Sequence, residues 1–158
     1  MMKEQTEPCV TICAPMEGES VPVTEVSDPV FGEETVGRGV AIRPAKGRVV
    51  APADGEVSMM FRTGHAVAMT LSGGVEVLIH VGLDTVNLGG SYFTPRAQNG
   101  EKVKKGDLLI EFDMESIAGE GYDLISPVIV TNHDDYKGMD AVAGKHVAEG
   151  DVLIKVNI

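Results

Sequence analysis

The chain has 158 residues, of which 43% are hydrophobic and 23% are charged, so it can bury the core of one compact domain and is not expected to be disordered. Lysine and arginine number 13 against 24 aspartates and glutamates, and this net charge of −11 argues against binding to nucleic acid or to anionic membrane surfaces. With 19 glycines, 8 prolines and only 4% aromatic residues, the composition favours many short strands around an aliphatic core.

The N-terminal region lacks the positive-then-apolar pattern of a secretion signal, and residues 1–8 are expected to form a flexible tail. No stretch of the chain approaches the roughly 18 consecutive apolar residues of a membrane span. Cys9 and Cys13 lie too far apart within one extended segment to form a disulfide, and no second pair of ligands accompanies them. We therefore expect reduced thiols and no metal in a single cytoplasmic domain that spans residues 1–158.

Short apolar runs rich in β-branched residues follow one another along the chain, and each is flanked by Gly, Pro, Asp or Asn. Such runs are typical of β-strands. The predicted strands are residues 10–13, 39–42, 66–71, 75–79, 107–112, 127–132 and 151–156. Helical turns are expected only at residues 113–121 and 134–142.

Two segments of the sequence occur twice. GEKVKKGDLLI at residues 100–110 returns as GKHVAEGDVLI at residues 144–154, and APMEGE at residues 14–19 returns as APADGE at residues 51–56. A repeated turn–strand unit indicates two similar β motifs that pack face to face. We therefore predict an all-β fold, an antiparallel β-sandwich or flattened barrel (a barrel-sandwich hybrid) with internal duplication and at most one or two short helical turns. The same glycine-bounded hairpin occurs in lipoyl and biotinyl carriers, so it indicates the fold better than the function.

Two predicted strands, residues 66–71 and 75–79, meet at Ser72–Gly74, where glycines supply the positive φ angles of a tight turn. If the last two residues of this segment form the loop, His65 and His80 are diagonal neighbours, roughly 7–8 Å apart at the backbone. If the first two form the loop, the histidines lie directly opposite each other. A loop one residue longer would separate the histidines onto opposite faces.

Both registers place Phe61, Thr63 and Leu78 on the same face as the two histidines. Desolvation lowers the pKa of an imidazole, and a second imidazole nearby lowers it further, so we expect uncharged rings near pH 7. An uncharged imidazole has a free lone pair, which a nucleophile toward phosphorus, or a metal ligand, requires.

The sequence around this pair offers little that could hold a phosphate without help. From Thr63 to Pro95 there is no Lys or Arg, whereas Glu76 and Asp84 are acidic. No Gly-x-x-x-x-Gly-Lys-Ser/Thr loop is present, which argues against ATP as a phosphoryl donor. If a phosphoryl group is handled here, a partner protein must supply the positive charge, and the acidity of the chain fits a basic partner.

Several blocks of the sequence resemble the glucose-type IIA domain of the bacterial phosphoenolpyruvate-dependent sugar phosphotransferase system. Residues 74–86, GVEVLIHVGLDTV, are similar to the phosphorylation-site motif of that family. The blocks that resemble the rest of the family, in its order, are residues 28–31, 39–44, 50–55, 63–65, 104–107, 111–113 and 127–132. The resemblance runs from about residue 14 to residue 154, which is nearly the whole chain.

This resemblance implies that His80 accepts a phosphoryl group through Nε2 from the phosphohistidine of the carrier protein HPr. The group then passes to a cysteine of a IIB domain, which phosphorylates sugar during uptake. The resemblance also implies that the main-chain oxygen of Gly82 accepts a hydrogen bond from Nδ1 of His80, that His65 stabilises the transferred group, and that Thr63 orients His65. The protein would then be a phosphotransferase with a phosphohistidine intermediate and no bound cofactor.

An apolar rim around the pair, with acidic residues beside it, is expected to receive the partners. The candidates for partner contact are Asp28, Val30, Phe31, Phe61, Leu78, Asp84 and Val86. Members of the family usually carry an acidic residue where this chain has Arg38, which bears on partner affinity rather than on the transfer chemistry. His133 and His146 lie in polar turns and are expected to be solvated.

Two other classes of function stay open at this stage. A zinc hydrolase would need three protein ligands, and His65, His80 and Asp84 could be proposed, but the His-x-His pair of zinc peptidases with a related β architecture is absent. A regulatory or scaffold protein would bind transporters or metabolic enzymes through the same rim, and this could also be a second role of a phosphocarrier.

Overall fold

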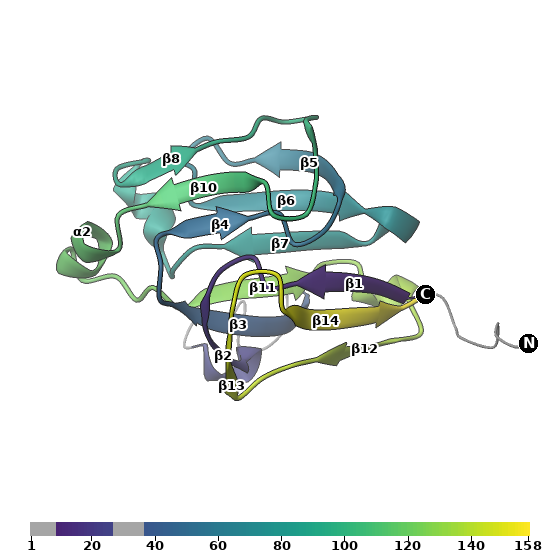
Figure 1. Ribbon diagram of the computed structural model, residues 1–158. Coiled ribbons are helices and arrows are strands. Elements are labelled where there is room, and N and C mark those ends of the chain that lie inside the picture. The colour runs from purple at the N-terminus through teal and green to yellow at the C-terminus, as the bar shows by residue number, and fades with distance from the viewer. Residues whose placement is uncertain (1–8, 27–36) are drawn as a thin grey trace, which may run out of the picture.

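The computed structural model describes residues 9–26 and 37–158, and within these ranges the protein is built almost entirely from antiparallel β-strands (Figure 1). The strands in the described part of the chain are arranged in one sheet of eight and two sheets of three. The expected N-terminal tail, residues 1–8, lies outside the described residues, as do the candidate contact residues Asp28, Val30 and Phe31.

In the large sheet, His80 is the last residue of a middle strand, and His65 directly precedes the strand beside it. The strands of this sheet are β2 (Gly18–Pro22), β3 (Arg38–Pro44), β5 (Gly55–Met60), β6 (Ala66–Leu71), β7 (Glu76–His80), β9 (Lys102–Val103), β11 (Ser126–Val130) and β13 (Lys145–Val147). They follow the order β13-β2-β3-β11-β7-β6-β5-β9.

The two small sheets lie over the large one (Figure 1). Their strands are β1 (Cys9–Cys13), β4 (Arg48–Val50), β8 (Phe93–Pro95), β10 (Leu108–Phe112), β12 (Gly138–Ala141) and β14 (Val152–Asn157). One sheet has the order β1-β14-β12 and the other the order β4-β10-β8. The predicted antiparallel β-sandwich is confirmed, and within the described ranges the sheets do not close into a barrel.

The helical content is low, as predicted, but one of the two expected helical segments is wrong. The α-helix in the described part of the chain, α2 (Met114–Gly119), begins after Asp113, whose carboxylate caps it by accepting a hydrogen bond from Ser116 N at 3.1 Å. Residues 134–142 instead contain the end of a short 3₁₀ turn, η5 (His133–Asp135), followed by the edge strand β12. The half-exposed residues of β12 lack the apolar alternation that reveals a strand.

None of the helices described is long and apolar enough to cross a membrane.

The sequence repeats occupy equivalent places in two halves of the fold. The strands β13-β2-β3-β11 match β9-β5-β6-β7 in reversed order, so the halves meet where β11 pairs with β7. The correspondence extends to single hydrogen bonds. Asp107 accepts one from Lys104 N at 2.9 Å, and Asp151 accepts its counterpart from Ala148 N at 2.9 Å. The predicted internal duplication is thus present in the fold.

Reciprocal main-chain hydrogen bonds join each copy of the APxxGE segment to the residue that precedes the other copy. Cys13 N donates to Pro52 O at 2.9 Å, and Val50 N donates to Pro15 O at 2.7 Å. Because Cys13 is in β1 and Val50 is in β4, these hydrogen bonds lie at the ends of one strand from each small sheet.

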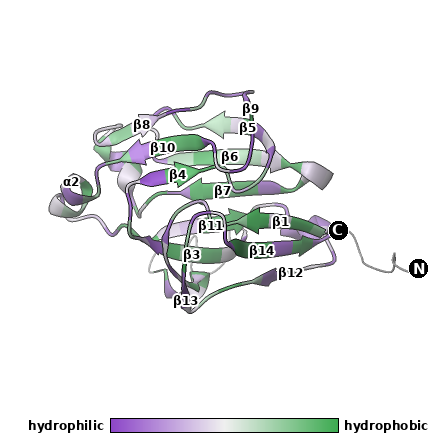
Figure 2. Cartoon of the chain, in the orientation of Figure 1, coloured by the Kyte–Doolittle hydropathy of each residue, from purple (hydrophilic) through white to green (hydrophobic). Residues whose placement is uncertain are grey.

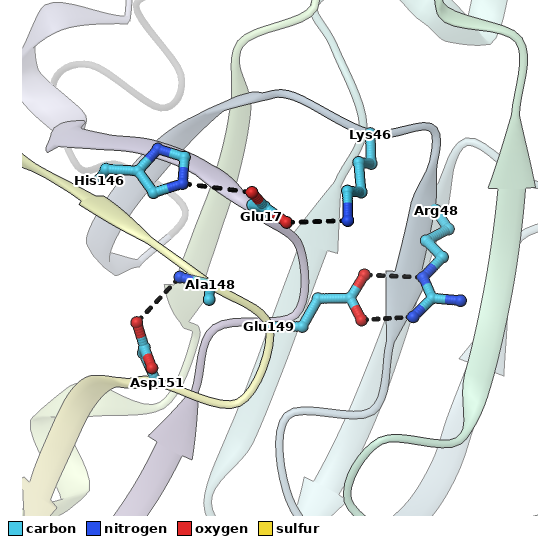
Figure 3. Close-up of polar contacts among 7 residues, drawn as sticks. All are labelled: Glu17, Lys46, Arg48, His146, Ala148, Glu149 and Asp151. Carbon is cyan, nitrogen blue, oxygen red and sulfur yellow. Dashed lines mark hydrogen bonds and ion pairs between the residues drawn. The ribbon is translucent and has the colours of Figure 1, made fainter.

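Charged contacts also cross between distant segments on the surface (Figure 3). The Arg48 guanidinium donates two hydrogen bonds to Glu149, at 2.7 and 2.6 Å. Glu17 binds Lys46 at 3.1 Å and His146 at 3.3 Å. The hydrogen bond from Lys46, and to a smaller extent that from His146, holds the pKa of Glu17 below its ordinary value. Because such exposed ion pairs contribute little to stability, the apolar core must supply most of it.

The core between the sheets is aliphatic, and the buried strands are hydrophobic along most of their length (Figure 2). The largest fully buried side chains of this core are Ile12, Met16, Val40, Ile42, Met69, Ile79, Leu109, Ile110, Ile117, Leu153 and Ile154.

A smaller apolar cluster lies on the other face of the large sheet, and we call it the outer cluster. It contains Val21, Val23, Val26, Ala41, Leu83, Ile125 and Ile129, with Leu78 packed against it. Side chains alternate between the two faces of a strand, so Leu78 and His80 of β7 point to the same side. The outer cluster therefore places an apolar surface beside His80.

Truncation of the fully buried Ile154 to alanine should lower the free energy of unfolding by about 2–5 kcal/mol, because it leaves a cavity in the core. Val152, two residues earlier in β14, is 44% exposed, so Val152→Ala should cost less than about 1 kcal/mol. Chemical denaturation followed by circular dichroism measures both losses. Equal losses would contradict the burial described for β14.

Candidate functional site

The loop of the β6–β7 hairpin differs from both predictions. Leu71 N donates to Val75 O at 2.8 Å, so the loop contains all three residues of Ser72–Gly74. Ala66, and not His65, is the residue that pairs with His80. Both predicted registers are therefore wrong, since one additional loop residue shifts the pairing by one position.

The two imidazoles nevertheless meet. Their ring centroids are 5.0 Å apart, and the ring planes are inclined at 80°. His65 lies before the first residue of β6 and directly after Gly64, whose φ of 74° interrupts the extended conformation. Alternation between faces holds only for extended residues, so the register does not dictate the direction of this ring. The predicted juxtaposition of the histidines is confirmed, although the predicted reason for it is not.

His65 is the more buried of the two histidines, with 4% of its surface exposed. Thr63 Oγ1 forms a hydrogen bond with its Nδ1, and the Phe61 ring packs against it in a T-shaped arrangement at a centroid distance of 5.4 Å. Desolvation, and secondarily the nearby His80, lowers the pKa of His65 to about 4. The His65 ring is therefore uncharged at neutral pH.

His80 is half-buried at the end of β7, and its Nδ1 lies 2.7 Å from the carbonyl oxygen of Gly82. A carbonyl oxygen can only accept a hydrogen bond, so this contact requires a proton on Nδ1. In the uncharged ring the lone pair is then on Nε2. The contact fixes both the tautomer and the orientation of the imidazole.

The two peptide groups that flank Gly82 are themselves held by hydrogen bonds. Gly82 N donates to Ser126 Oγ at 3.2 Å, and the Thr85 hydroxyl donates to the carbonyl oxygen of the residue before Gly82. On the other side, Leu83 N donates to Asp123 O at 3.0 Å. Gly82 has a φ of 75°, and a Cβ there would lie 2.7 Å from Thr85 Cγ2, so the position requires glycine.

Thr85 and Ser126 are site residues that the sequence did not reveal. Both are fully buried polar side chains. The available signal was that each is a hydroxyl next to buried apolar residues, where it must find a hydrogen-bond partner. The sequence alone does not show that the partners are the peptide groups beside Gly82.

The candidates for partner contact within the described residues differ in what they touch and in how exposed they are. Leu78 packs against the outer cluster on the same face of β7 as His80, and Phe61 contacts His65. Asp84 is exposed, and so is Val86 in the 3₁₀ helix η4 (Thr85–Leu88). An exposed acidic residue, Asp84, and an exposed apolar residue, Val86, thus come shortly after His80 in the chain.

The other two histidines do not join this pair. His133, in η5, has its Nδ1 3.2 Å from Asp134 Oδ1, and the exposed His146, in β13, has its Nε2 3.3 Å from Glu17 Oε2 (Figure 3). Within residues 9–26 and 37–158, no group of three or more His, Cys, Asp or Glu side chains is arranged to hold a metal ion.

Comparison with known proteins places this geometry in context. Residues 10–136 match the family model described as phosphoenolpyruvate-dependent sugar phosphotransferase system, EIIA 1. The chain is 41% identical over 150 residues to the glucose-specific EIIA component of Oceanobacillus iheyensis, which covers 95% of this chain and 91% of that protein. It is 47% identical over 137 residues to the β-glucoside-specific EIIBCA component of Dickeya chrysanthemi, covering 87% of this chain but only 22% of that longer protein.

The fold is also similar to a solved structure, that of glucose permease IIA from Mycoplasma capricolum. The TM-score is 0.88 with 33% sequence identity, and the match covers 98% of this chain and 99% of that one.

An NMR pH titration should find the pKa of His65 near 4, well below the ordinary value of 6.5. Because the folded state binds this proton less readily than the unfolded chain does, the stability from uncharged His65 is fully present above about pH 6.5. It is lost as the pH falls toward 4. A titration midpoint near 6.5 would contradict the burial of this ring.

Proposed function

Because the chain belongs to the EIIA 1 family of the phosphoenolpyruvate-dependent sugar phosphotransferase system, we propose that it carries a phosphoryl group on Nε2 of His80. The donor is the phosphohistidine of HPr, and the acceptor is a cysteine of a IIB domain that phosphorylates sugar during uptake. The observation that carries this proposal is the 2.7 Å contact between His80 Nδ1 and Gly82 O, which leaves the lone pair on Nε2.

The relay consists of two transfers between side chains. In the first, the lone pair of His80 Nε2 forms a bond to phosphorus, and the phosphorus–nitrogen bond to the HPr histidine breaks with its electrons returning to that ring. In the second, a IIB thiolate forms a phosphorus–sulfur bond, and the bond to Nε2 breaks. Such loose, in-line transfers depend on positioning and on charge stabilisation.

His65 stabilises the phosphoryl group from beside His80. With the Thr63 hydroxyl donating to Nδ1 of His65, the proton of the uncharged ring is on Nε2, where it can be donated to a phosphoryl oxygen. The 5.0 Å between the ring centroids allows both imidazoles to contact one phosphoryl group. Thr63 is thus a positioning residue for His65.

The positive charge that the phosphoryl group needs comes from the partners. The chain has a net charge of −11, and the exposed Asp84 is available to basic side chains beside His80. Phe61, Leu78 and Val86 form the apolar border that excludes water, and Asp28, Val30 and Phe31, outside the described residues, complete the set of candidate contacts. The name EIIBCA among the relatives supports a IIB domain as one partner. We propose the cytoplasm as the place of the relay.

Incubation with HPr, the first enzyme of the pathway and phosphoenolpyruvate should place one acid-labile phosphoryl group on the wild-type protein. His80→Ala should take up none, because the attacking nitrogen is gone. His146→Ala, which alters an exposed histidine of another strand, should be labelled like the wild type. Labelling of the folded His80→Ala variant would refute the assignment of His80 as the acceptor.

Substitution of His65 should separate acceptance from delivery. We expect His65→Ala to be labelled still, because the Nε2 lone pair of His80 remains. Transfer to a IIB domain should fall about 100-fold or more, because a donor beside the phosphoryl group is lost. Rapid-quench measurement of both transfers gives the two rates. Equal and total loss in His65→Ala and His80→Ala would contradict this division of roles.

A further inference from the structure

The carbonyl group that orients His80 belongs to a residue that cannot hold its own conformation. Gly82 has no side chain, and its φ of 75° is one of several conformations open to glycine. The direction of its carbonyl therefore depends on hydrogen bonds to the adjacent peptide groups. The carbonyl belongs to the peptide between Gly82 and Leu83, and its direction depends on the φ of Gly82. If the preceding peptide, between Val81 and Gly82, were not held in place, this φ could change and the contact with Nδ1 of His80 would weaken.

The hydroxyl of Ser126 holds this peptide from a different strand. Ser126 opens β11, is 0% exposed, and accepts the hydrogen bond of Gly82 N at 3.2 Å. Its own proton is donated to Leu124 O at 2.8 Å. Since a serine hydroxyl has one proton, this second bond turns an oxygen lone pair toward Gly82 N. Donor and acceptor are therefore fixed for each hydrogen bond in the series that runs from Leu124 O through Ser126 and Gly82 to His80.

The same peptide is held at its opposite end by Thr85, whose hydroxyl donates to Val81 O. Thr85 lies only three residues after Gly82, whereas Ser126 belongs to the neighbouring strand of the large sheet. β11 pairs with β7 through Ile79 and Val128, so Ser126 ties the turn to the rigid part of the fold. Leu83 N, bound to Asp123 O at 3.0 Å, adds a second tie to the same segment.

We propose that Ser126 is a positioning residue for phosphoryl transfer: through the Gly82 peptide, its hydroxyl holds His80 in the tautomer that leaves Nε2 free. Ser126 does not touch the reacting atoms. The part of this proposal that concerns transfer rests on the proposed function of His80. The part that concerns the tautomer applies to the unphosphorylated protein and does not depend on that function.

A second buried serine provides a matched control. Ser20, in β2 of the same sheet, is also 0% exposed, and its hydroxyl donates to Lys145 O at 3.1 Å. Ser20→Ala removes a buried hydroxyl and one hydrogen bond without affecting the Gly82 turn. It therefore measures what such a loss costs in stability alone.

The test compares Ser126→Ala and Ser126→Cys with Ser20→Ala and the wild type. Cysteine keeps the shape of the side chain but accepts hydrogen bonds weakly, so it is informative even if the alanine variant folds poorly. The ring ¹⁵N shifts of His80 report its tautomer in the unphosphorylated proteins. Rapid-quench labelling by phosphorylated HPr gives the transfer rate, and chemical denaturation gives the stability.

We expect Ser126→Ala to lose part of the Nδ1-protonated tautomer and to be phosphorylated about tenfold more slowly, as is typical when a supporting hydrogen bond to a functional histidine is lost. Ser126→Cys should show a smaller change of the same kind. Ser20→Ala should lose stability while it keeps the wild-type tautomer and rate.

The proposal would be overturned if folded Ser126 variants kept the wild-type tautomer and rate while their stability fell as in Ser20→Ala. A changed tautomer with an unchanged rate would also overturn it, because orientation would then not limit transfer. If the wild type itself is not labelled at His80, the proposed function fails. A tautomer that shifts in the Ser126 variants would then still establish the contact through Gly82.

Discussion

The hydrogen bond from His80 Nδ1 to the Gly82 carbonyl determines which nitrogen of the ring is free to react. Because a carbonyl oxygen can only accept, this 2.7 Å contact requires the proton on Nδ1, and much of the surrounding structure keeps the acceptor in place. Gly82 is fixed by contacts from Thr85, Ser126 and the Asp123 carbonyl, which come from its own turn and from the neighbouring strand region. The chemistry thus depends on main-chain geometry that the large sheet imposes on a short, glycine-containing turn.

The second constraint is the absence of charge on His65. Burial and the neighbouring imidazole lower its pKa to about 4. The ring centroids of the two histidines can therefore lie 5.0 Å apart at neutral pH without charge repulsion between the rings. An uncharged His65 binds a phosphoryl group less tightly than a cationic side chain would. In the relay that we propose this is favourable, because a group that must leave for the next partner should not be held strongly, and charge brought by each partner assists only while that partner is bound.

The sequence predicted the fold well where the pattern is local. β6 coincides with the predicted strand 66–71, and the two repeated segments predicted the duplication. The hairpin register was wrong because Ser72–Gly74 accommodates loops of two or three residues equally well, since glycine tolerates either backbone path. The half-exposed strand β12 lacks apolar alternation, and the role of Ser126 depends on a partner 44 residues away in the chain. Contacts of that kind follow from the assembled sheet and not from any local pattern.

We propose that phosphorus bonds to Nε2 of His80 while Nδ1 keeps its proton and donates it in a hydrogen bond to the Gly82 carbonyl. A ³¹P–¹⁵N coupling experiment on the phosphorylated, ¹⁵N-labelled protein tests it directly. We expect one coupled nitrogen, the Nε2 of His80, together with a protonated Nδ1 in the same ring. Coupling to Nδ1 of His80, or to either nitrogen of His65, would contradict the claim.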